Sequence, residues 1–219
     1  MGLSMKRVCV CLLVLAGWCH ADELKTFSFN CDAWAEGDVP KEVFVVDGTI
    51  KIAAKDGSKA IMIDPTPITD ATAQLGDSSN GSSSIEVRVF ASKKGRSTPR
   101  FGVSVHGMNG YRLIANIGKK QVELIKGDQV IKSAPFAWTT GTWTKLRLEV
   151  KKTSDTEWSI TGKVWPADGE EPKEAAIQHT DATMKGQGKC AIWGTPFSET
   201  PIYFDDIKVG ITPVVSAKE

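Results

Sequence analysis

Apolar and polar residues alternate along much of this chain, most clearly in segment 99–126, PRFGVSVHGMNGYRLIANIGKKQVELIK. At its start Phe101 and Val103 share one face while the residues between them share the other, as in a sheet with one buried side. Glycine-containing turns at 107–110 and 118–120 divide the segment. It therefore predicts three consecutive antiparallel strands.

Ten further segments are bounded by turn residues and rich in β-branched or alternating apolar residues. They are 43–46, 49–54, 59–63, 84–91, 129–132, 143–151, 157–165, 175–179, 188–193 and 202–209. No segment has a convincing 3.6-residue period, so we expect an all-β protein, a two-sheet antiparallel β-sandwich of the jelly-roll type.

Three dipeptides predict tight turns between neighbouring strands: Asp47-Gly48, Asp56-Gly57 and Gly127-Asp128. Asp-Gly between β-branched runs is a strong local hairpin signal because both residues tolerate positive φ. The polar run 77–84, DSSNGSSS, and the acidic run 166–174, PADGEEPKE, are predicted to be loops.

Residues 1–21 have the pattern of an export signal. Lys6 and Arg7 precede a short apolar run, and small residues stand at the positions that a signal peptidase inspects before Asp22. The run is shorter than the roughly 20 residues that a bilayer span needs. We therefore expect an exported protein, periplasmic or extracellular, with a sandwich at 22–210, a mobile tail at 211–219 and no membrane span after cleavage.

The charge of the chain excludes some partners. The full sequence has a formal net charge of +1, and cleavage before Asp22 removes two of its positive residues. A nearly neutral chain without a block of Lys and Arg argues against nucleic acid or an anionic membrane as partner, because both require a clustered positive field. The oligomeric state does not follow from the sequence.

Two cysteines, Cys31 and Cys190, remain after the predicted cleavage. An even number in an oxidising compartment favours a disulfide, and it would close a long loop if the first and last strands lie side by side. Two separate buried thiols are the alternative.

Familiar catalytic motifs are absent from the expected mature chain: it has no HExxH, CxxC, phosphate-binding loop or Gly-x-Ser-x-Gly. A polar strand face is the better candidate for binding. We expect one shared face to carry Arg88, Arg100, Ser104, His106, Arg112 and Asn116. Such groups bind hydroxyls or a carboxylate through paired hydrogen bonds. The alternative is a ladder of ion pairs with Glu86 and Glu123.

Six tryptophans follow the predicted signal. An exposed aromatic face holds a sugar ring because the ring's C–H bonds lie flat on the π surface. Trp165 points away from the apolar side of its strand and is the best candidate, with Trp193 and Trp138 behind it. Trp143 and Trp158 are expected in the core.

The order of these elements resembles the concanavalin A-like lectin/glucanase jelly rolls, in particular exported bacterial laminin-G-like and 3-keto-disaccharide-hydrolase-type domains. The likeness lies in GVSVHGMNGYRLIANIG, in Gly141-x-Trp143-x-x-Leu146, in Gly186-x-Gly188 and in the terminal run Phe204–Ile207. It implies two stacked sheets, one of which often holds glycan. It also suggests a structural calcium ion at Asp205 or Asp206, where a strand-end carboxylate satisfied by its neighbours is the alternative.

The glucanase pattern Glu-x-Asp-x-Glu does not occur in this sequence, which argues against the hydrolysis those enzymes perform. We therefore expect an exported carbohydrate-binding or accessory module that is not catalytic. One alternative is a glycoside- or keto-sugar-active hydrolase that uses Glu86 or Glu123. Another is a structural cell-envelope domain without a small ligand.

Overall fold

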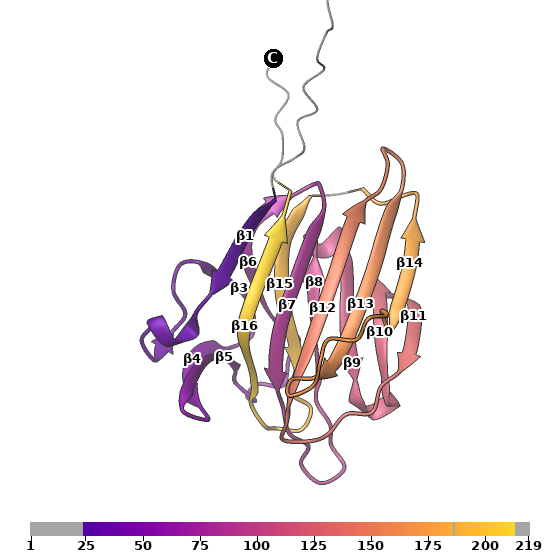
Figure 1. The fold of residues 1–219 in the computed structure, drawn as a ribbon. Helices are drawn as coiled ribbons and strands as arrows, with labels where there is room; N and C mark the ends of the chain where they lie inside the picture. Colours follow the sequence, from indigo (N-terminus) through magenta and orange to yellow (C-terminus); the bar gives the residue numbers. More distant parts are fainter. Residues whose placement is uncertain (1–23, 186, 213–219) are drawn as a thin grey trace, which may run out of the picture.

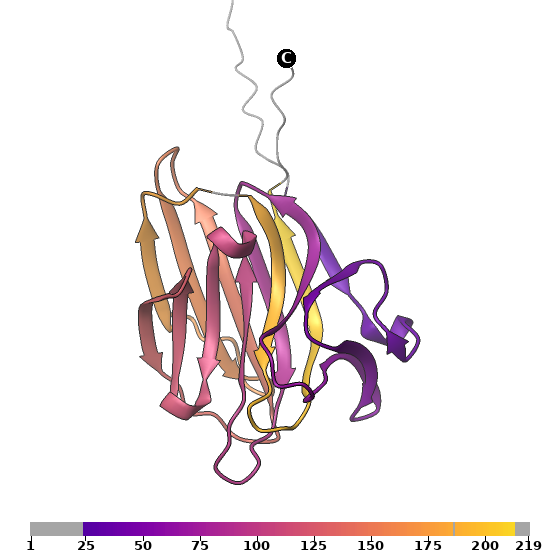
Figure 2. The ribbon, with the colours of Figure 1, turned by 180° about the vertical axis from the view of Figure 1, so that it is seen from behind.

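The computed structural model describes residues 24–185 and 187–212. They form two antiparallel β-sheets packed face to face (Figures 1 and 2). Three short 3-10 helices accompany the strands: η1 (Cys31–Ala33), η2 (Gly107–Asn109) and η3 (Ile117–Lys119). The predicted all-β, two-sheet sandwich is confirmed.

The nine-stranded sheet stands in front in Figure 1, and we call it sheet A. Its strands lie in the order β14 (Ile177–Asp181), β13 (Trp158–Pro166), β12 (Trp143–Lys152), β7 (Ser83–Phe90), β16 (Ile202–Ile211), β5 (Ser58–Ile63), β4 (Ile50–Lys55) and β2 (Gly37–Asp38). The ninth strand, β1 (Lys25–Phe29), pairs with the second half of β16, while β5 pairs with its first half.

The seven-stranded sheet stands in front in Figure 2, and we call it sheet B. Its strands lie in the order β11 (Gln129–Pro135), β10 (Gln121–Lys126), β9 (Tyr111–Asn116), β8 (Arg100–Val105), β15 (Gly188–Thr195), β6 (Ala71–Ser79) and β3 (Val43–Asp47). The segment predicted to form three consecutive strands contains β8, β9 and β10, which are neighbours in this sheet.

The core lies between the two sheets and is built from one side of each strand. In β7 it takes Ile85, Val87 and Val89, and in β8 it takes Phe101 and Val103, all fully buried. This is the side that the alternation assigned to the interior. The other side of each strand forms the outer face of its sheet, and the candidate binding residues are to be sought there.

Two of the three predicted hairpins are confirmed. Lys55 pairs with Ser58 around Asp56-Gly57, and Lys126 pairs with Gln129 around Gly127-Asp128. The prediction at Asp47-Gly48 is wrong, since this turn carries the chain from β3 in sheet B to β4 in sheet A. Residues 77–79, predicted to be loop, are the end of β6.

The predicted export signal at 1–21 lies outside the described residues, as does the predicted tail beyond Thr212. Strand β16 runs to Ile211, one residue into the segment that we expected to be tail. Among the described residues, no helix has the length and apolar character needed to cross a membrane.

Candidate functional site

The outer face of sheet B carries a row of residues that are in register across all seven strands. From β3 to β11 the row is Phe44, Gln74, Ala191, Ser104, Arg112, Ile125 and Val130. Neighbouring strands lie about 4.8 Å apart, so the row spans about 29 Å. In Figure 2 no strand lies in front of β8, β9 and β10 on this side.

Residue size varies along this row. Its middle holds the small residues Ala191 and Ser104, both buried, whereas Phe44 near one edge is 60% exposed and Val130 near the other is 48% exposed. Arg112 stands beside Ser104 in the register. The row therefore has small side chains and Arg112 in its middle and an exposed apolar side chain near each end.

Of the two predicted arginines on this face, Arg100 lies 3.7 Å from Glu123, whereas Arg112 has no carboxylate partner among the described residues. One of its terminal nitrogens donates to the carbonyl of Gly127 at 2.6 Å. It forms no ion pair with any carboxylate in the described part of the chain. A guanidinium has five N–H donors, so most of those of Arg112 remain for a ligand.

A second row lies next to the first and contains Trp193, Gly102, Ile114 and Glu123. Trp193 packs with Ile114 and Ile125 into a small apolar cluster outside the main core. A side chain at Gly102 is excluded, because its Cβ would lie 2.2 Å from the carbonyl oxygen of Leu113. This row therefore places closely packed apolar side chains beside Arg112.

Glu123 organises the polar groups at the end of the face where η3 lies. Its carboxylate accepts hydrogen bonds from Gln121 at 2.6 Å and from Asn116 and Lys119 at 3.1 Å. Arg100 approaches it at 3.7 Å. Burial alone would raise the pKa of Glu123, but these hydrogen bonds outweigh it and lower the pKa. Asn116 and Lys119 therefore stabilise the Glu123 carboxylate. These contacts correspond in part to the alternative given above, a ladder of ion pairs that includes Glu123.

Four of the predicted residues, Arg100, Ser104, Arg112 and Asn116, are thus brought together on one face, and Arg88 is not among them. Arg88 lies on β7, on the outer face of sheet A, where it pairs with Asp205 at 2.6 Å and lies 4.5 Å from the ring centroid of Trp143. The prediction was wrong because alternation gives the side of a strand but not the sheet it joins.

His106 is also misplaced by the sequence prediction. It follows β8 in a left-handed conformation with φ 57°, which ends the alternation and turns its side chain inward. Its Nε2 lies 2.9 Å from the Ser83 hydroxyl, and its ring stands edge-on to Trp158. Burial lowers the pKa of His106. The residue belongs to the interior and not to the binding face.

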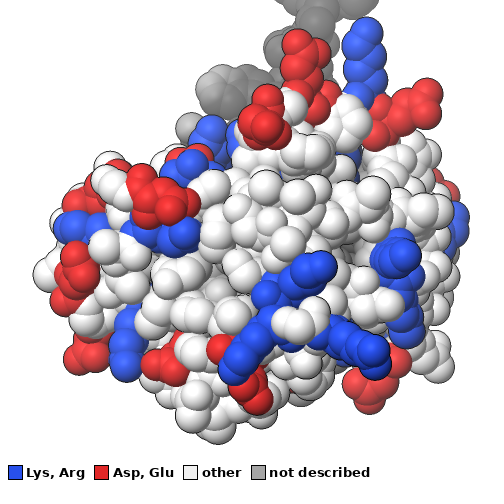
Figure 3. All heavy atoms as spheres, turned by 90° about the horizontal axis from the view of Figure 1, so that it is seen from below, with Lys and Arg blue, Asp and Glu red and all other residues white. Residues whose placement is uncertain are grey.

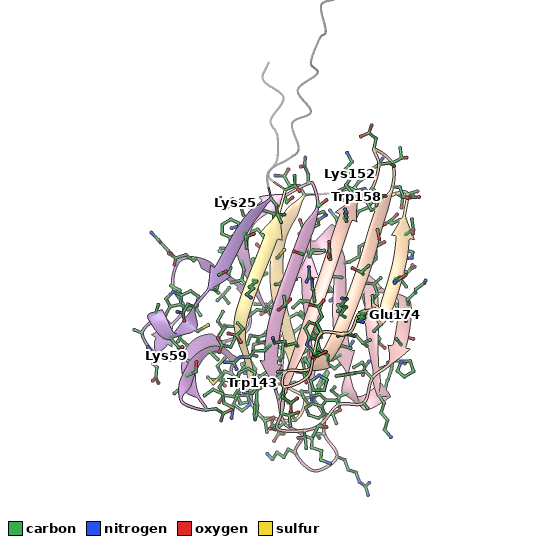
Figure 4. The ribbon with its side chains drawn as sticks, viewed as in Figure 1. Lys25, Lys59, Trp143, Lys152, Trp158 and Glu174 are labelled. Carbon is green, nitrogen blue, oxygen red and sulfur yellow. The ribbon has the colours of Figure 1, made fainter. Side chains whose placement is uncertain are left out.

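Trp165 does not offer the exposed ring that we predicted. It points outward from β13 but is only 5% exposed. The connection from β13 to β14 lies in front of β13, with Glu174 labelled on it in Figure 4. Trp158 is in the core, as expected, but Trp143 is partly exposed on the outer face of sheet A.

Asp205 and Asp206, the positions suggested for calcium, both face the Arg88 guanidinium, at 2.6 and 3.1 Å. They line a hollow of about 210 Å³ that Asp32 also lines. A calcium ion needs six to eight oxygen ligands, and a cation already neutralises these carboxylates. Among the described residues, no three His, Cys, Asp or Glu side chains lie close enough together to hold one metal ion, so the arrangement does not fit a calcium site.

Cys31 and Cys190 are both buried free thiols, so the disulfide prediction is wrong. The Cys190 sulfur lies 3.7 Å from the carbonyl oxygen of Ser84 on β7, whereas Cys31 lies on η1, which contacts β5. Strand β16 separates β7 from β5. Burial raises the pKa of each thiol to about 12.

The two carboxylates named for a hydrolase, Glu86 and Glu123, lie on opposite outer faces of the sandwich, on β7 and β10. Glu86 faces Arg147 at 3.8 Å. Acid and nucleophile in glycoside hydrolysis must flank one bond. These two residues therefore cannot act as a pair.

Phe44 is the aromatic residue that the sequence reasoning missed. The alternation in VFVVD placed it opposite Val43 and Val45, and only the position of β3 at the sheet edge leaves its ring exposed. The available signal was a phenylalanine that alternates with Val43 and Val45 in a short strand.

No protein-family profile matches this sequence, and no curated protein sequence matches it. Solved structures do match its fold. A carbohydrate-binding module from Bacillus subtilis aligns with a TM-score of 0.52 and 14% identity, covering 76% of this chain and 94% of that one.

Lectin II from Ulex europaeus aligns with a TM-score of 0.53 and 12% identity over 87% of this chain and 99% of the lectin. An alginate lyase from Aplysia kurodai aligns with a TM-score of 0.53 and 12% identity over 83% and 99%. These likenesses show a jelly-roll β-sandwich, the fold that the resemblance implied. The similar structures include sugar-binding proteins and a polysaccharide lyase.

Proposed function

We propose that this protein binds carbohydrate on the outer face of sheet B, around Arg112. The observation that carries the proposal is an arginine without a carboxylate partner in the described chain, in the middle of a sheet face that no described strand covers. Its guanidinium can donate paired hydrogen bonds to hydroxyls or to a carboxylate.

The surroundings of Arg112 suit a saccharide. Small residues, Ala191 and Ser104, stand beside it in the same row, and Phe44 exposes a ring at the end of that row. Aromatic and polar side chains on one rigid surface are typical of ligand sites. The carbohydrate-binding module and the lectin with the same fold support this reading.

The test is a glycan array with the protein, followed by calorimetry with the best ligand for the wild type and for Arg112→Ala. Hydrogen bonds to a charged group contribute about 1.5–3 kcal/mol, so the substitution should lower affinity about 10- to 150-fold. Arg147→Ala is the matched control, an arginine on the outer face of sheet A, and should leave affinity unchanged. Silence on the array, or equal losses in both variants, would contradict the proposal and favour a structural role.

We also propose that the protein is exported, which the signal-like residues 1–21 support. Determination of the N-terminal sequence of the protein from its native host should find Asp22 first. An N-terminus at Met1 would contradict export by cleavage.

A further inference from the structure

A hollow of about 530 Å³ lies at the end of the sandwich where β9 passes through η3 into β10. Its apolar wall consists of Ile117, Phe136 and Trp138. Phe136 and Trp138 are partly buried and pack on the core, so this wall is fixed. The volume is within the range of about 300–1,000 Å³ that is typical of small-molecule sites.

Two lysines line the same hollow, Lys93 and Lys120. Neighbouring basic residues have partners, since Lys94 pairs with Glu199 at 2.7 Å and Lys119 pairs with Glu123 at 3.1 Å. Within the described chain neither Lys93 nor Lys120 pairs with a carboxylate. Figure 3 views this end from below Figure 1 and shows Lys and Arg side chains gathered across it.

The backbone holds both lysines in place. The Lys120 N–H donates to the Ile117 carbonyl at 3.0 Å, and its own carbonyl accepts from the Phe136 N–H at 3.0 Å. The Lys93 N–H donates to the Thr140 hydroxyl at 2.9 Å. The main chain of both lysines is thus fixed where their side chains line a hollow with an aromatic wall, which suits a ligand that has an apolar face and carries negative charge.

The hollow adjoins the face of sheet B described above. Arg100 and Asn116 are opposite one another in the register at this end of the face. The next residues along the chain, Ile117 after β9, Lys120 before β10 and Phe136 after β11, line the hollow. A chain-like ligand on the outer face of sheet B would therefore meet the hollow when it passes beyond Arg100 and Asn116.

From this placement we propose that the hollow binds an anionic sugar residue of the saccharide held by sheet B. The sugar ring would lie on Phe136 and Trp138, and its carboxylate or sulfate would lie between Lys93 and Lys120. This inference rests on the proposed function, and it names the ligand class as acidic saccharides.

The test compares three oligosaccharides of equal length, one uronic, one sulfated and one neutral, by calorimetry with the full chain. The wild type should bind at least one acidic oligosaccharide ten times more tightly than the neutral one. Lys93→Gln with Lys120→Gln should remove this preference, leave neutral binding unchanged and reduce the salt dependence of acidic binding. The pair of acidic probes distinguishes a carboxylate ligand from a sulfate ligand.

The matched control is Lys151→Gln with Lys152→Gln, at the opposite end of β12, where Figure 4 labels Lys152 far from Trp143. This double variant should keep the preference, and thermal unfolding should show that both double variants are folded. Equal affinity for acidic and neutral probes, or an equal loss in the control, would overturn the inference.

The two proposals fail separately. Binding of all three probes with equal affinity, lost in Arg112→Ala, would overturn the acidic hollow and leave the sheet site standing. Acidic binding that requires Lys93 and Lys120 but not Arg112 would overturn the sheet site and confine the ligand to the hollow. No binding of any probe would overturn both.

Discussion

The outer faces of the two sheets differ in how their charged side chains are paired. On sheet A, Arg147 lies within 3.8 Å of Glu86 and 3.7 Å of Glu171, and Lys163 pairs with Glu171 at 2.7 Å. The connection that contains Glu171 lies in front of this sheet (Figure 1). Trp165, which points outward from the same sheet, is buried. The charges of sheet A are thus used to fasten a loop.

On sheet B the outer face carries one buried carboxylate, Glu123, toward one end, and Arg112 without a carboxylate partner in the described chain. No described strand lies in front of its middle. The charged residues of the two faces therefore differ: on sheet A they pair with one another, whereas on sheet B Glu123 holds its neighbours and Arg112 has no carboxylate partner among the described residues. The predictions below test this distinction through the free energy of unfolding and through binding.

The largest effect is expected for Trp165→Ala. Its ring is 5% exposed although it points outward, so the substitution should leave a cavity under the β13–β14 connection. Substitution of a buried tryptophan by alanine costs about 3–5 kcal/mol. Urea unfolding should show this loss, with saccharide affinity unchanged. A loss below 1 kcal/mol would show that the connection does not cover the ring.

Glu123→Gln should have the next largest effect. The substitution removes a charge that accepts hydrogen bonds from Asn116, Gln121 and Lys119, and bonds to a charged group contribute about 1.5–3 kcal/mol. Urea unfolding at neutral pH should show a loss of that size. An unchanged midpoint would mean that this buried carboxylate does not stabilise sheet B.

The stabilisation by Glu123 should also depend on pH. Its pKa is lower in the folded protein than the ordinary value of 4.5, so the unfolded chain binds the proton more readily. The stabilisation is therefore complete above about pH 4.5 and is lost as the pH falls through the folded pKa. The stability difference between wild type and Glu123→Gln should shrink on acidification from pH 7 to pH 3, and a constant difference would contradict this cause.

A smaller effect is expected for Glu171→Gln on sheet A. Its pairs with Lys163 and Arg147 are partly exposed, and such pairs contribute about 0–1 kcal/mol. Unfolding measurements at low and high salt should show a small loss that salt reduces further. A loss as large as that of Glu123→Gln would remove the distinction between the two faces.

The smallest effect on stability is expected for Phe44→Ala. Its side chain is 60% exposed, and exposed substitutions change stability by about 0.5 kcal/mol or less. Saccharide affinity should nevertheless fall several-fold, because the exposed ring is lost from the end of the Arg112 row. Unchanged affinity would remove Phe44 from the proposed site.

The sequence predicted the strands better than their partners. Local turn chemistry was sufficient for the hairpin at Asp56-Gly57, but the similar dipeptide Asp47-Gly48 joins two different sheets. Which of the two occurs depends on pairing outside the turn: β3 pairs with the more distant strand β6, in the other sheet from the β4–β5 hairpin. Such long-range pairing leaves no mark in the turn itself.

The candidate site was predicted in part for the same reason. Arg100, Ser104, Arg112 and Asn116 come from adjacent strands of one meander, so alternation sufficed to place them together. Arg88 belongs to a strand of the other sheet, and Trp165 is buried although its side chain points outward from β13. Sheet membership and loop placement are tertiary properties that periodicity does not contain.

The pairing of β1 with β16 determines which end of the sandwich would face outward if the chain were attached to a surface or to another module. Lys25 lies opposite Ile211, so the described chain enters and leaves within about one strand spacing, about 5 Å. Figure 1 shows this point at one end of the sandwich, while the loop between β7 and β8 lies at the other. A tether at either terminus, to a surface or to a neighbouring module, would therefore direct Lys93 and Lys120 away from the attachment, toward whatever approaches from outside.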